Sequence, residues 1–558
     1  MNRSTGFYVA AIASIQLCIA LGTEAVLPHT QAGEVLYNGI VLSDPWPPEV
    51  KSLPRDPIEP PYLRSPPAVI PIDIGRQLFV DEFLIASTSL QRTYHRPTFY
   101  ESNPVLVPTE SWEKTGRGPM AIPHSGGVWF DPQDQMFKMW YITGYQEGVG
   151  LAYSKDGLRW HRPSFSHVLP DSNMVYGRAS RGSTIWLHHE ADAPSGRFVM
   201  FSSRPPRVWL SADGIHWGGA HAVAGKMADR TTLFWNPFRQ VWVYSVKTLI
   251  DGRRARRYWE TPELVRHHRS TWPSIETPAL WVGADSADLP RDDLQVSCQL
   301  YALDCVAYES LLLGTFIIWR GDYRFDSQTD AAREQNALGR PKQNAACIGF
   351  SRDGFHWSRP DRRVFLPKSQ TPGDWNWGNS QVAAGSPMVV GDQLYFYVAG
   401  RGGLKFPGNK YQDAGGSTGV AFLRRDGFAS MDADSSGGTL TTRPVRFSGQ
   451  YLFVNVDCPQ GQLRIEILDS EGKVILPYSM VNCTPISVDS TRHRVKWQAS
   501  DKLADLVGQH VRFRFHLERG ALYAFWVSAH RGGASGGYVG AGGPGFTSNR
   551  DLPAKVSD

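Results

Sequence analysis

A short unit built around an Asp-Gly turn and a following Trp recurs along this 558-residue chain. Copies span Gly150–Pro163, Trp209–Trp217 and Gly349–Pro360, and a weaker copy without the Trp spans Phe422–Phe428. Because Asp-Gly tolerates the positive φ of a two-residue hairpin, each copy predicts a short strand, a tight turn and a second short strand. Hairpins repeated in this way are typical of radially arranged four-stranded sheets. The repeat therefore predicts a β-propeller.

A second kind of hairpin gives the number of sheets. Apolar and aromatic runs broken by Asn, Asp, Pro or Gly are strand and turn signals, and they occur at residues 127–142, 183–201, 231–245 and 386–398. The run at 303–319 belongs with them but shows no turn and carries Glu309 among apolar residues. These runs predict five blades starting near residues 124, 182, 229, 303 and 379. We expect the strand Gln77–Ile85 to complete the ring.

The remaining segments predict the domain boundaries. Residues 1–25 hold a basic start and an apolar run, typical of a signal peptide, and residues 26–74 form a Pro-rich extended lead-in. The propeller is expected over residues 75–432. Period-two alternation over residues 438–530 predicts an antiparallel β-sandwich, and the Gly-rich residues 531–558 predict a flexible tail.

Composition and cysteines limit the classes of function. A chain that is 41% hydrophobic and 20% charged is an ordinary globular protein, and its net charge of +5 makes no case for nucleic acid. The signal peptide predicts a periplasmic or extracellular protein, with no membrane contact after cleavage. No phosphate loop, dinucleotide fingerprint or metal-ligand spacing occurs, so we expect no cofactor and no metal. Cys458 and Cys483 either pair or remain buried thiols.

Candidate binding residues come from the geometry of a propeller. Its innermost strands line a tunnel, and the loops before them converge on one mouth. Polar residues just before those strands, and one Trp on a nearby loop, are the candidates for binding a substrate: Trp112, His124, Arg181, Arg230, Asp304, Asn379 and Gln381.

Three carboxylates are candidates for acid and base catalysis. Glu309 lies in an apolar run, where burial would raise its pKa and keep it protonated, as a general acid requires. Asp229, beside Arg230, is the expected base, and Glu113 is the reserve. Each has a structural alternative: Glu309 as a core carboxylate paired with an Arg or a Tyr or as an outward-pointing residue, Asp229 as a turn cap, and Glu113 in a purely structural role. The Asp residues of the repeated turns are interpreted as structural.

A basic run, Asp251–Arg257, follows the third predicted hairpin. One interpretation is a solvated face. The other is a loop over the mouth that binds a carboxylated or sulfated sugar, because guanidinium groups match such anions in a two-pronged way.

The layout resembles the propeller glycoside hydrolases of families 32, 43 and 130 and their secreted relatives. The resemblance rests on Asn103–Leu106, the Trp112-Glu113 pair, the repeated Tyr-Ser-x-Asp-Gly-x-x-Trp pattern and the following sandwich. It implies a secreted glycosidase that cleaves a carbohydrate between two carboxyl groups. The place that holds the nucleophile in invertase-like enzymes reads Pro123–Gly127 here, with no carboxylate. The alternatives are a non-catalytic carbohydrate-binding or interaction propeller, and a lyase or sialidase-like enzyme that uses a Tyr and Arg cluster.

Overall fold

The computed structural model describes residues 33–553, except residues 117, 145–146, 178–183, 192–195, 223–224, 266–273, 292–296, 321–342, 372, 378–380, 383–386 and 403–414. The expected signal peptide lies outside the described residues. Within them the chain is almost entirely β, with one short helix, α1 (Pro61–Arg64), and two 3-10 turns, η1 (Ser111–Lys114) and η3 (Ala504–Leu506). No helix in the described part is long and apolar enough to cross a bilayer.

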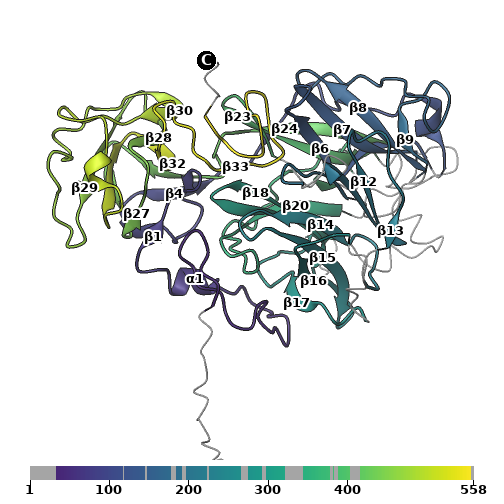
Figure 1. The fold of residues 1–558 in the computed structure, drawn as a ribbon, viewed down its shortest axis with the longest axis horizontal. Helices are drawn as coiled ribbons and strands as arrows, with labels where there is room; N and C mark the ends of the chain where they lie inside the picture. The colour runs from purple at the N-terminus through teal and green to yellow at the C-terminus, as the bar shows by residue number, and fades with distance from the viewer. Residues whose placement is uncertain are drawn as a thin grey trace, which may run out of the picture.

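Five antiparallel meanders follow one another from residue 121 to residue 424, on the right of Figure 1. Meander 1 holds β6 (Ala121–Asp131), β7 (Met136–Thr143), β8 (Gly148–Ser154) and β9 (Met174–Tyr176). Meander 2 holds β10 (Thr184–Leu187), β11 (Phe198–Ser203), β12 (Pro206–Ser211) and β13 (His221–Ala222). Meander 3 holds β14 (Thr232–Asn236), β15 (Val241–Ile250), β16 (Arg253–Thr261) and β17 (Ala279–Gly283). Meander 4 holds β18 (Gln299–Glu309), β19 (Leu311–Arg320) and β20 (Gln343–Ser351). Meander 5 holds β21 (Gln381–Val382), β22 (Met388–Val390), β23 (Gln393–Arg401), β24 (Gly416–Arg424) and, from early in the chain, β5 (Thr98–Phe99).

The first strands of meanders 1 to 4 are bonded to one another in a closed circuit. Thr184 of β10 forms a parallel bridge with Ser125 of β6, and its hydroxyl accepts a hydrogen bond of 3.3 Å from the amide of Leu233 in β14. Thr232 of β14 donates to the carbonyl of Leu303 in β18 at 3.3 Å. The Ser125 hydroxyl then donates to Asp304 of β18 at 3.2 Å. These first strands therefore surround a common axis.

Three of the repeated Asp-Gly units link their own meander to the one before it around the ring. Within a unit, the Asp156 carboxylate accepts hydrogen bonds of 2.8 Å from the amides of Leu158 and Arg159, and Asp213 and Asp353 bind their own turns in the same way. The carbonyl of Gly214 then accepts a bond from the Trp140 indole of meander 1. Equivalent bonds run from Trp281 to Phe355 and from Tyr397 of meander 5 back to Gly157 of meander 1. The Asp side chains are structural, as predicted, and the turns fasten neighbouring sheets.

The second half of each unit is not the strand that the sequence predicted. Beyond the turns, the first and third copies make only single bridges, Tyr153 with His161 and Phe350 with Ser358. The fourth strand of meander 1, β9, begins only at Met174. The Asp carboxylate holds the next two amides in a turn, so those amides are not available to a strand ladder.

Two further antiparallel sheets lie beside the meanders, on the left of Figure 1, and share one buried apolar core. One contains β30 (Asp489–Arg494), β28 (Tyr451–Asp457), β32 (Gly520–Ser528), β25 (Ala429–Ala433), β4 (Gln91–Tyr94) and β2 (Gln77–Leu78). The other contains β29 (Gln462–Leu468), β31 (Arg512–Glu518), β26 (Gly438–Thr442) and β3 (Ile85–Thr88). A separate parallel pair joins β1 (Ile70–Pro71) to β27 (Val445–Arg446).

The expected role of the early strand is wrong. Residues 77–94 pair with the C-terminal sheets, whereas β5 completes meander 5 by pairing with β24. Phe79 explains the placement, because it is fully buried and stacks on Phe525 of the C-terminal core.

The Gly-rich C-terminal segment is ordered and packed through residue 553, which corrects the flexible tail expected there. It runs between the two halves of the molecule and contains β33 (Tyr538–Val539), which pairs with the end of β18. A Cβ added to Gly543 would lie 1.7 Å from the Val389 carbonyl, and one added to Gly540 would lie 2.3 Å from that of Pro387. Glycine is therefore needed here for close approach of backbones, not for flexibility.

Residues 538–549, which we name the axial plug, contact all five meanders. Meander 1 is reached through Phe130, whose amide donates to Ala541 at 2.9 Å, and meander 2 through Glu190, which accepts from Asn549 at 3.0 Å. Tyr538 donates to Pro237 of meander 3 at 3.4 Å. Meander 4 is reached because β33 pairs with β18. Meander 5 is reached by two hydrogen bonds, in which the Ala541 amide donates to the Pro387 carbonyl and the Val389 amide donates to the Gly542 carbonyl. The plug thus closes the end of the axis where the first strands end.

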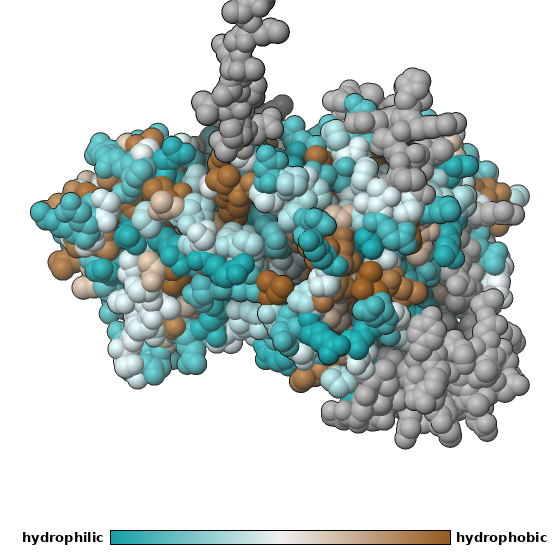
Figure 2. Space-filling model, turned by 90° about the horizontal axis from the view of Figure 1, so that it is seen from below, coloured by the Kyte–Doolittle hydropathy of each residue, from teal (hydrophilic) through white to brown (hydrophobic). Residues whose placement is uncertain are grey.

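The five described cysteines are buried and unpaired, Cys458 and Cys483 among them. Figure 2 shows one face of the molecule, which is mostly hydrophilic with separate apolar spots. Large exposed apolar side chains such as Val35, Ile58 and Leu476 come from distant parts of the chain.

Candidate functional site around Asp304

Asp304 lies on the axis, where β18 meets β6 and β14. Its Oδ2 accepts the bond from Ser125, whereas its Oδ1 has no hydrogen-bond partner among the described residues. The residue is 4% exposed. Burial raises the pKa of this carboxyl above its ordinary range, because desolvation disfavours the charged form.

Asp229 stands in a contrasting environment just before β14. Its side chain is 25% exposed, and its Oδ1 accepts a 2.6 Å bond from the Lys247 ammonium. Although burial alone would raise it, the pKa of Asp229 is lowered, because the hydrogen bond and charge of Lys247 and the charges of Arg204 and Arg230 outweigh burial. The pKa values of the two carboxyl groups are therefore shifted in opposite directions, that of Asp229 downward and that of Asp304 upward.

The basic run is divided by the alternation of β16. Arg254 and Arg256 are buried, whereas Arg253 is exposed and Arg257 is half-buried, donating to the carbonyls of Glu276 and Pro278. Arg254 stacks 3.9 Å over Trp319 and donates to Gln299 in β18. A fully solvated face is therefore excluded, because Arg253 is the only exposed residue among residues 253–257.

Arg256 connects the two aspartates. It is fully buried and donates to the carbonyls of Arg230, Ser245 and Tyr301. Burial lowers its pKa to about 10, while the charges of Asp304 and Asp229 act to raise it. Arg256 and Arg230 both act electrostatically on Asp229 and Asp304, so the four side chains form one cluster. We name Asp229, Arg230, Lys247, Arg254, Arg256 and Asp304 the mouth cluster.

Sequence reasoning named three of these six residues as site residues: Asp229, Arg230 and Asp304. It missed Lys247, although a lone cation in the apolar strand Val241–Ile250 was a usable signal. It noted Arg254 and Arg256 only within the basic run, because their orientation depends on the register of β16 against β15.

Glu309 does not lie at the mouth, which corrects its expected position. It occupies the tight turn between β18 and β19 with a φ of 48°, at the opposite end of β18 from Gln299. Its fully buried carboxylate accepts bonds from Ser535 at 2.7 Å, from the amide of Arg76 at 3.1 Å and from Arg425 at 3.1 Å. Both oxygens are thus occupied, in a network that joins meander 4 to the C-terminal sheets.

Glu113 is likewise fixed by its neighbours. Its buried carboxylate accepts hydrogen bonds from Tyr141 at 2.6 Å, from Arg162 at 2.7 Å and from the amides of Thr109 and Glu110. Trp112, beside it, donates its indole N–H to Asn173 at 3.1 Å. This arrangement anchors η1 to meander 1 and corresponds to the structural alternative for Glu113.

The other expected binding residues are placed as follows. His124 is buried in β6, next to an irregularity in the pairing of β6 with β7. Arg230 has a φ of 62° and lies 5.7 Å from the Tyr301 ring. Arg181, Asn379 and the side chain of Gln381 lie outside the described residues. In the described part of the chain, no group of three or more His, Cys, Asp or Glu residues is placed to hold a metal ion.

No family model matches the sequence, and no curated protein matches it. Among solved structures, the chain is similar to a GH32 beta-fructofuranosidase of Bombyx mori, with 9% identity, 82% of this chain and 95% of that one covered, and a TM-score of 0.32. It is also similar to a GH130 protein described with glycoside hydrolases that target beta-1,2 mannosidic linkages in Candida mannan, with 16% identity, 61% and 97% coverage and a TM-score of 0.32. An exo-beta-1,3-galactanase of Phanerochaete chrysosporium shows 9% identity, 78% and 99% coverage and a TM-score of 0.30. Likenesses at this level assign no role to any residue of this chain.

Proposed function

We propose that the protein is a secreted glycosidase whose five meanders are the blades of a five-bladed β-propeller, followed by a β-sandwich. Its substrate site is the mouth cluster, with Asp304 as general acid and Asp229 as general base or nucleophile. The observation that carries this proposal is the opposite shift of the two carboxyl pKa values within one cluster. Glycoside cleavage needs one protonated and one ionised carboxyl group, and unlike environments provide that difference.

The charges of the mouth favour an acidic carbohydrate. Four cations, Arg230, Lys247, Arg254 and Arg256, accompany two aspartates, and burial raises the pKa of one of them, Asp304. A carboxylate or sulfate on the sugar would offset the excess positive charge, and guanidinium groups suit such anions. The axial plug closes the other end of the axis, so the substrate enters from the mouth.

The test is turnover of neutral, uronate and sulfated glycans, measured as released reducing ends. We expect Asp304→Asn and Asp229→Asn each to lower turnover by roughly 10²- to 10⁴-fold, the usual contribution of a positioned acid or base. The wild-type rate should fall as pH rises through the raised pKa of Asp304, because the acid is then deprotonated. Undiminished turnover in Asp304→Asn would refute its role.

Substrate charge is tested separately with Arg254→Gln. We expect the KM for an acidic glycan to rise by roughly 10-fold or more, the value of a hydrogen bond to a charged group, with little change for a neutral glycan. An equal change for both would remove the preference for acidic substrates. Binding of glycans without any release of reducing ends or unsaturated products would favour the non-catalytic alternative, which the absence of a carboxylate in Pro123–Gly127 supports.

A further inference from the structure

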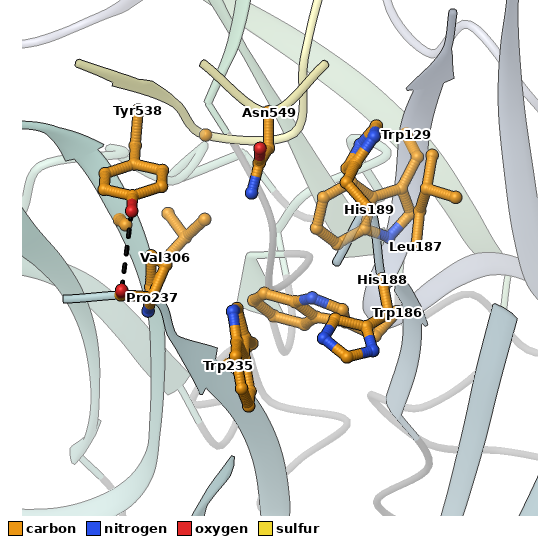
Figure 3. A pocket seen from close by; sticks show the side chains of 12 residues that line it. Trp129, Trp186, Leu187, His188, His189, Trp235, Pro237, Val306, Tyr538 and Asn549 are labelled. Atoms are coloured by element: carbon orange, nitrogen blue, oxygen red, sulfur yellow. Dashed lines mark hydrogen bonds between the residues drawn. The ribbon is translucent and has the colours of Figure 1, made fainter. Parts of the chain in front are cut away.

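The closed end of the axis has almost no free interior (Figure 3). Trp129, Trp235 and Tyr538 line the space beside the axial plug, and what remains between the side chains holds roughly one or two water molecules. A sugar ring does not fit there. Binding of a larger ligand away from the mouth cluster therefore depends on the outer surface, where charge takes the place of enclosure.

A concentration of positive charge on that surface follows β30, in the upper part of the C-terminal sheets in Figure 1. Residues 489–502 contain two aspartates and four cations, Arg492, Arg494, Lys496 and Lys502. We name these four cations the basic edge. Arg494 is half-buried and the other three are exposed. Short basic runs of this kind are typical of surfaces that bind sulfated polymers or nucleic acid.

The Tyr451 ring holds two of these cations beside each other. The guanidinium of Arg494 lies 5.8 Å from the ring centroid, and the ammonium of Lys502 lies 5.9 Å from it. An aromatic face attracts cations at such distances. The amide of Leu503 also donates to the carbonyl of Gln450 at 2.8 Å, which fixes the loop that carries Lys502 next to β28. The fold thus gathers cations from a strand and from the loop that follows it.

Little of this charge is neutralised within the fold. Arg494 lies 3.5 Å from Asp501, whose side chain is 38% exposed. The other aspartate, Asp489, is bound by Arg424 at 2.6 Å. The other three cations of the basic edge form no ion pair with the described residues. The surface therefore keeps a net positive charge that is open to solvent.

Protection of the sheet edge does not fully account for the basic edge. β30 is the last strand of its sheet, and charged side chains on such a strand prevent pairing with another chain. Charge of either sign serves that purpose, whereas the basic edge carries one sign only. The shared sign indicates an anionic partner.

A carbohydrate suits this surface better than a nucleic acid. Proteins that bind single-stranded nucleic acid stack the bases on exposed aromatic rings. The Tyr451 ring already carries Arg494 and Lys502. An anionic sugar chain needs no such ring, because salt bridges and hydrogen bonds to its charged groups are sufficient.

We propose that the basic edge binds a sulfated polysaccharide chain. An exposed ion pair contributes little by itself, because water and salt screen it. A ligand held here must therefore form several ion pairs over a short length, and a sulfated sugar chain carries its charges densely. The site is separate from the mouth cluster and does not depend on the proposed catalysis.

The probe is a heparin octasaccharide, with a dextran octasaccharide as the neutral control and oligothymidylate as the nucleic acid. Binding to the full chain is measured by titration calorimetry at low and physiological salt. We expect the heparin probe to bind, and to bind more weakly as the salt concentration rises. Arg492→Gln/Arg494→Gln/Lys496→Gln should weaken its binding by roughly 10-fold or more, because several exposed ion pairs are lost together.

The matched control is Lys51→Gln/Arg55→Gln/Arg64→Gln. It removes the same amount of charge from exposed side chains in and before α1, in the lower part of Figure 1, and should bind the heparin probe as the wild type does. Arg492→Gln/Lys496→Gln, which changes exposed side chains only, decides the matter if the first triple variant does not fold.

The proposal is wrong if the heparin probe does not bind, if the dextran binds equally well, or if oligothymidylate binds more tightly. It is also wrong if the basic-edge variant binds as the wild type does, or if the matched control loses as much affinity. Binding that is lost in Arg254→Gln and kept in the basic-edge variant would place the acidic glycan at the mouth cluster. That result would support the proposed function while refuting this second site.

Discussion

The two ends of β18 carry buried carboxyl groups in opposite situations. Asp304, in the mouth cluster, has one hydrogen-bonded oxygen and one without a partner among the described residues. Glu309, at the closed end, has both oxygens engaged by Arg76, Arg425 and Ser535. Both look alike in sequence, as acids within apolar runs. The two carboxyl groups differ in unused bonding capacity and not in burial, because both are buried.

The largest effect on stability should come from Glu309→Ala. Removing this carboxylate deprives the buried guanidinium groups of Arg76 and Arg425 of a charge partner. Breaking a buried ion pair lowers the free energy of unfolding by about 3–5 kcal/mol. We expect Asp304→Asn to cost less than about 1 kcal/mol, because Ser125 can still donate to the amide oxygen. Chemical denaturation of both variants measures the contrast, and equal losses would erase the distinction between the two ends.

A smaller loss should follow from a methyl group in the axial plug. Gly543→Ala would press a Cβ against the Val389 carbonyl, and such overpacking costs about 1–3 kcal/mol. Gly532→Ala is the matched control, because a Cβ there meets nothing within 4 Å. Similar melting temperatures for the two variants would show that the plug backbone can move to accommodate the methyl group and is not tightly packed against meander 5.

A further effect should be a pH dependence of stability set by His189 at the closed end. Its pKa is lowered from 6.5 to about 4 in the folded state, so between these values the unfolded chain binds more protons. Its contribution is fully present above pH 6.5 and is lost as pH falls toward 4. Comparing wild type with His189→Asn across this range isolates the effect, and parallel curves would mean that the ring protonates as easily in the folded chain.

The sequence predicted the strands well where turns and periodicity are local. The Asp-Gly turns, the first hairpins of the meanders and the alternating strand Gln462–Leu468 all lie where expected. The turn at Glu309 and Ser310 was missed because it lacks the Gly, Asn or Asp that usually adopts positive φ in a two-residue hairpin. The surrounding network holds Glu309 at positive φ instead. Partners distant in the chain could not be predicted either, such as Phe79 with Phe525.

The candidate site was predictable in part, for the same reason. Asp229 and Asp304 could be found because they lie just before or within first strands, but their opposite pKa shifts depend on Lys247, which comes from another strand, and on the burial of Asp304 in the fold. The glycines of the plug were misinterpreted because composition alone cannot distinguish a flexible glycine-rich segment from one whose backbone packs closely against its neighbours.

The contacts of Tyr538 to Asn549 with every meander also bear on how the protein is made. A ribosome delivers the first strand of meander 1 some four hundred residues before the segment that spans all five sheets. The native fold can therefore be completed only after residue 549 has left the ribosome. Until then the five sheets lack the contacts that residues 538–549 make with all of them. A chain interrupted upstream of that point would carry most of the fold and still expose the apolar ends of its first strands to chaperones and proteases.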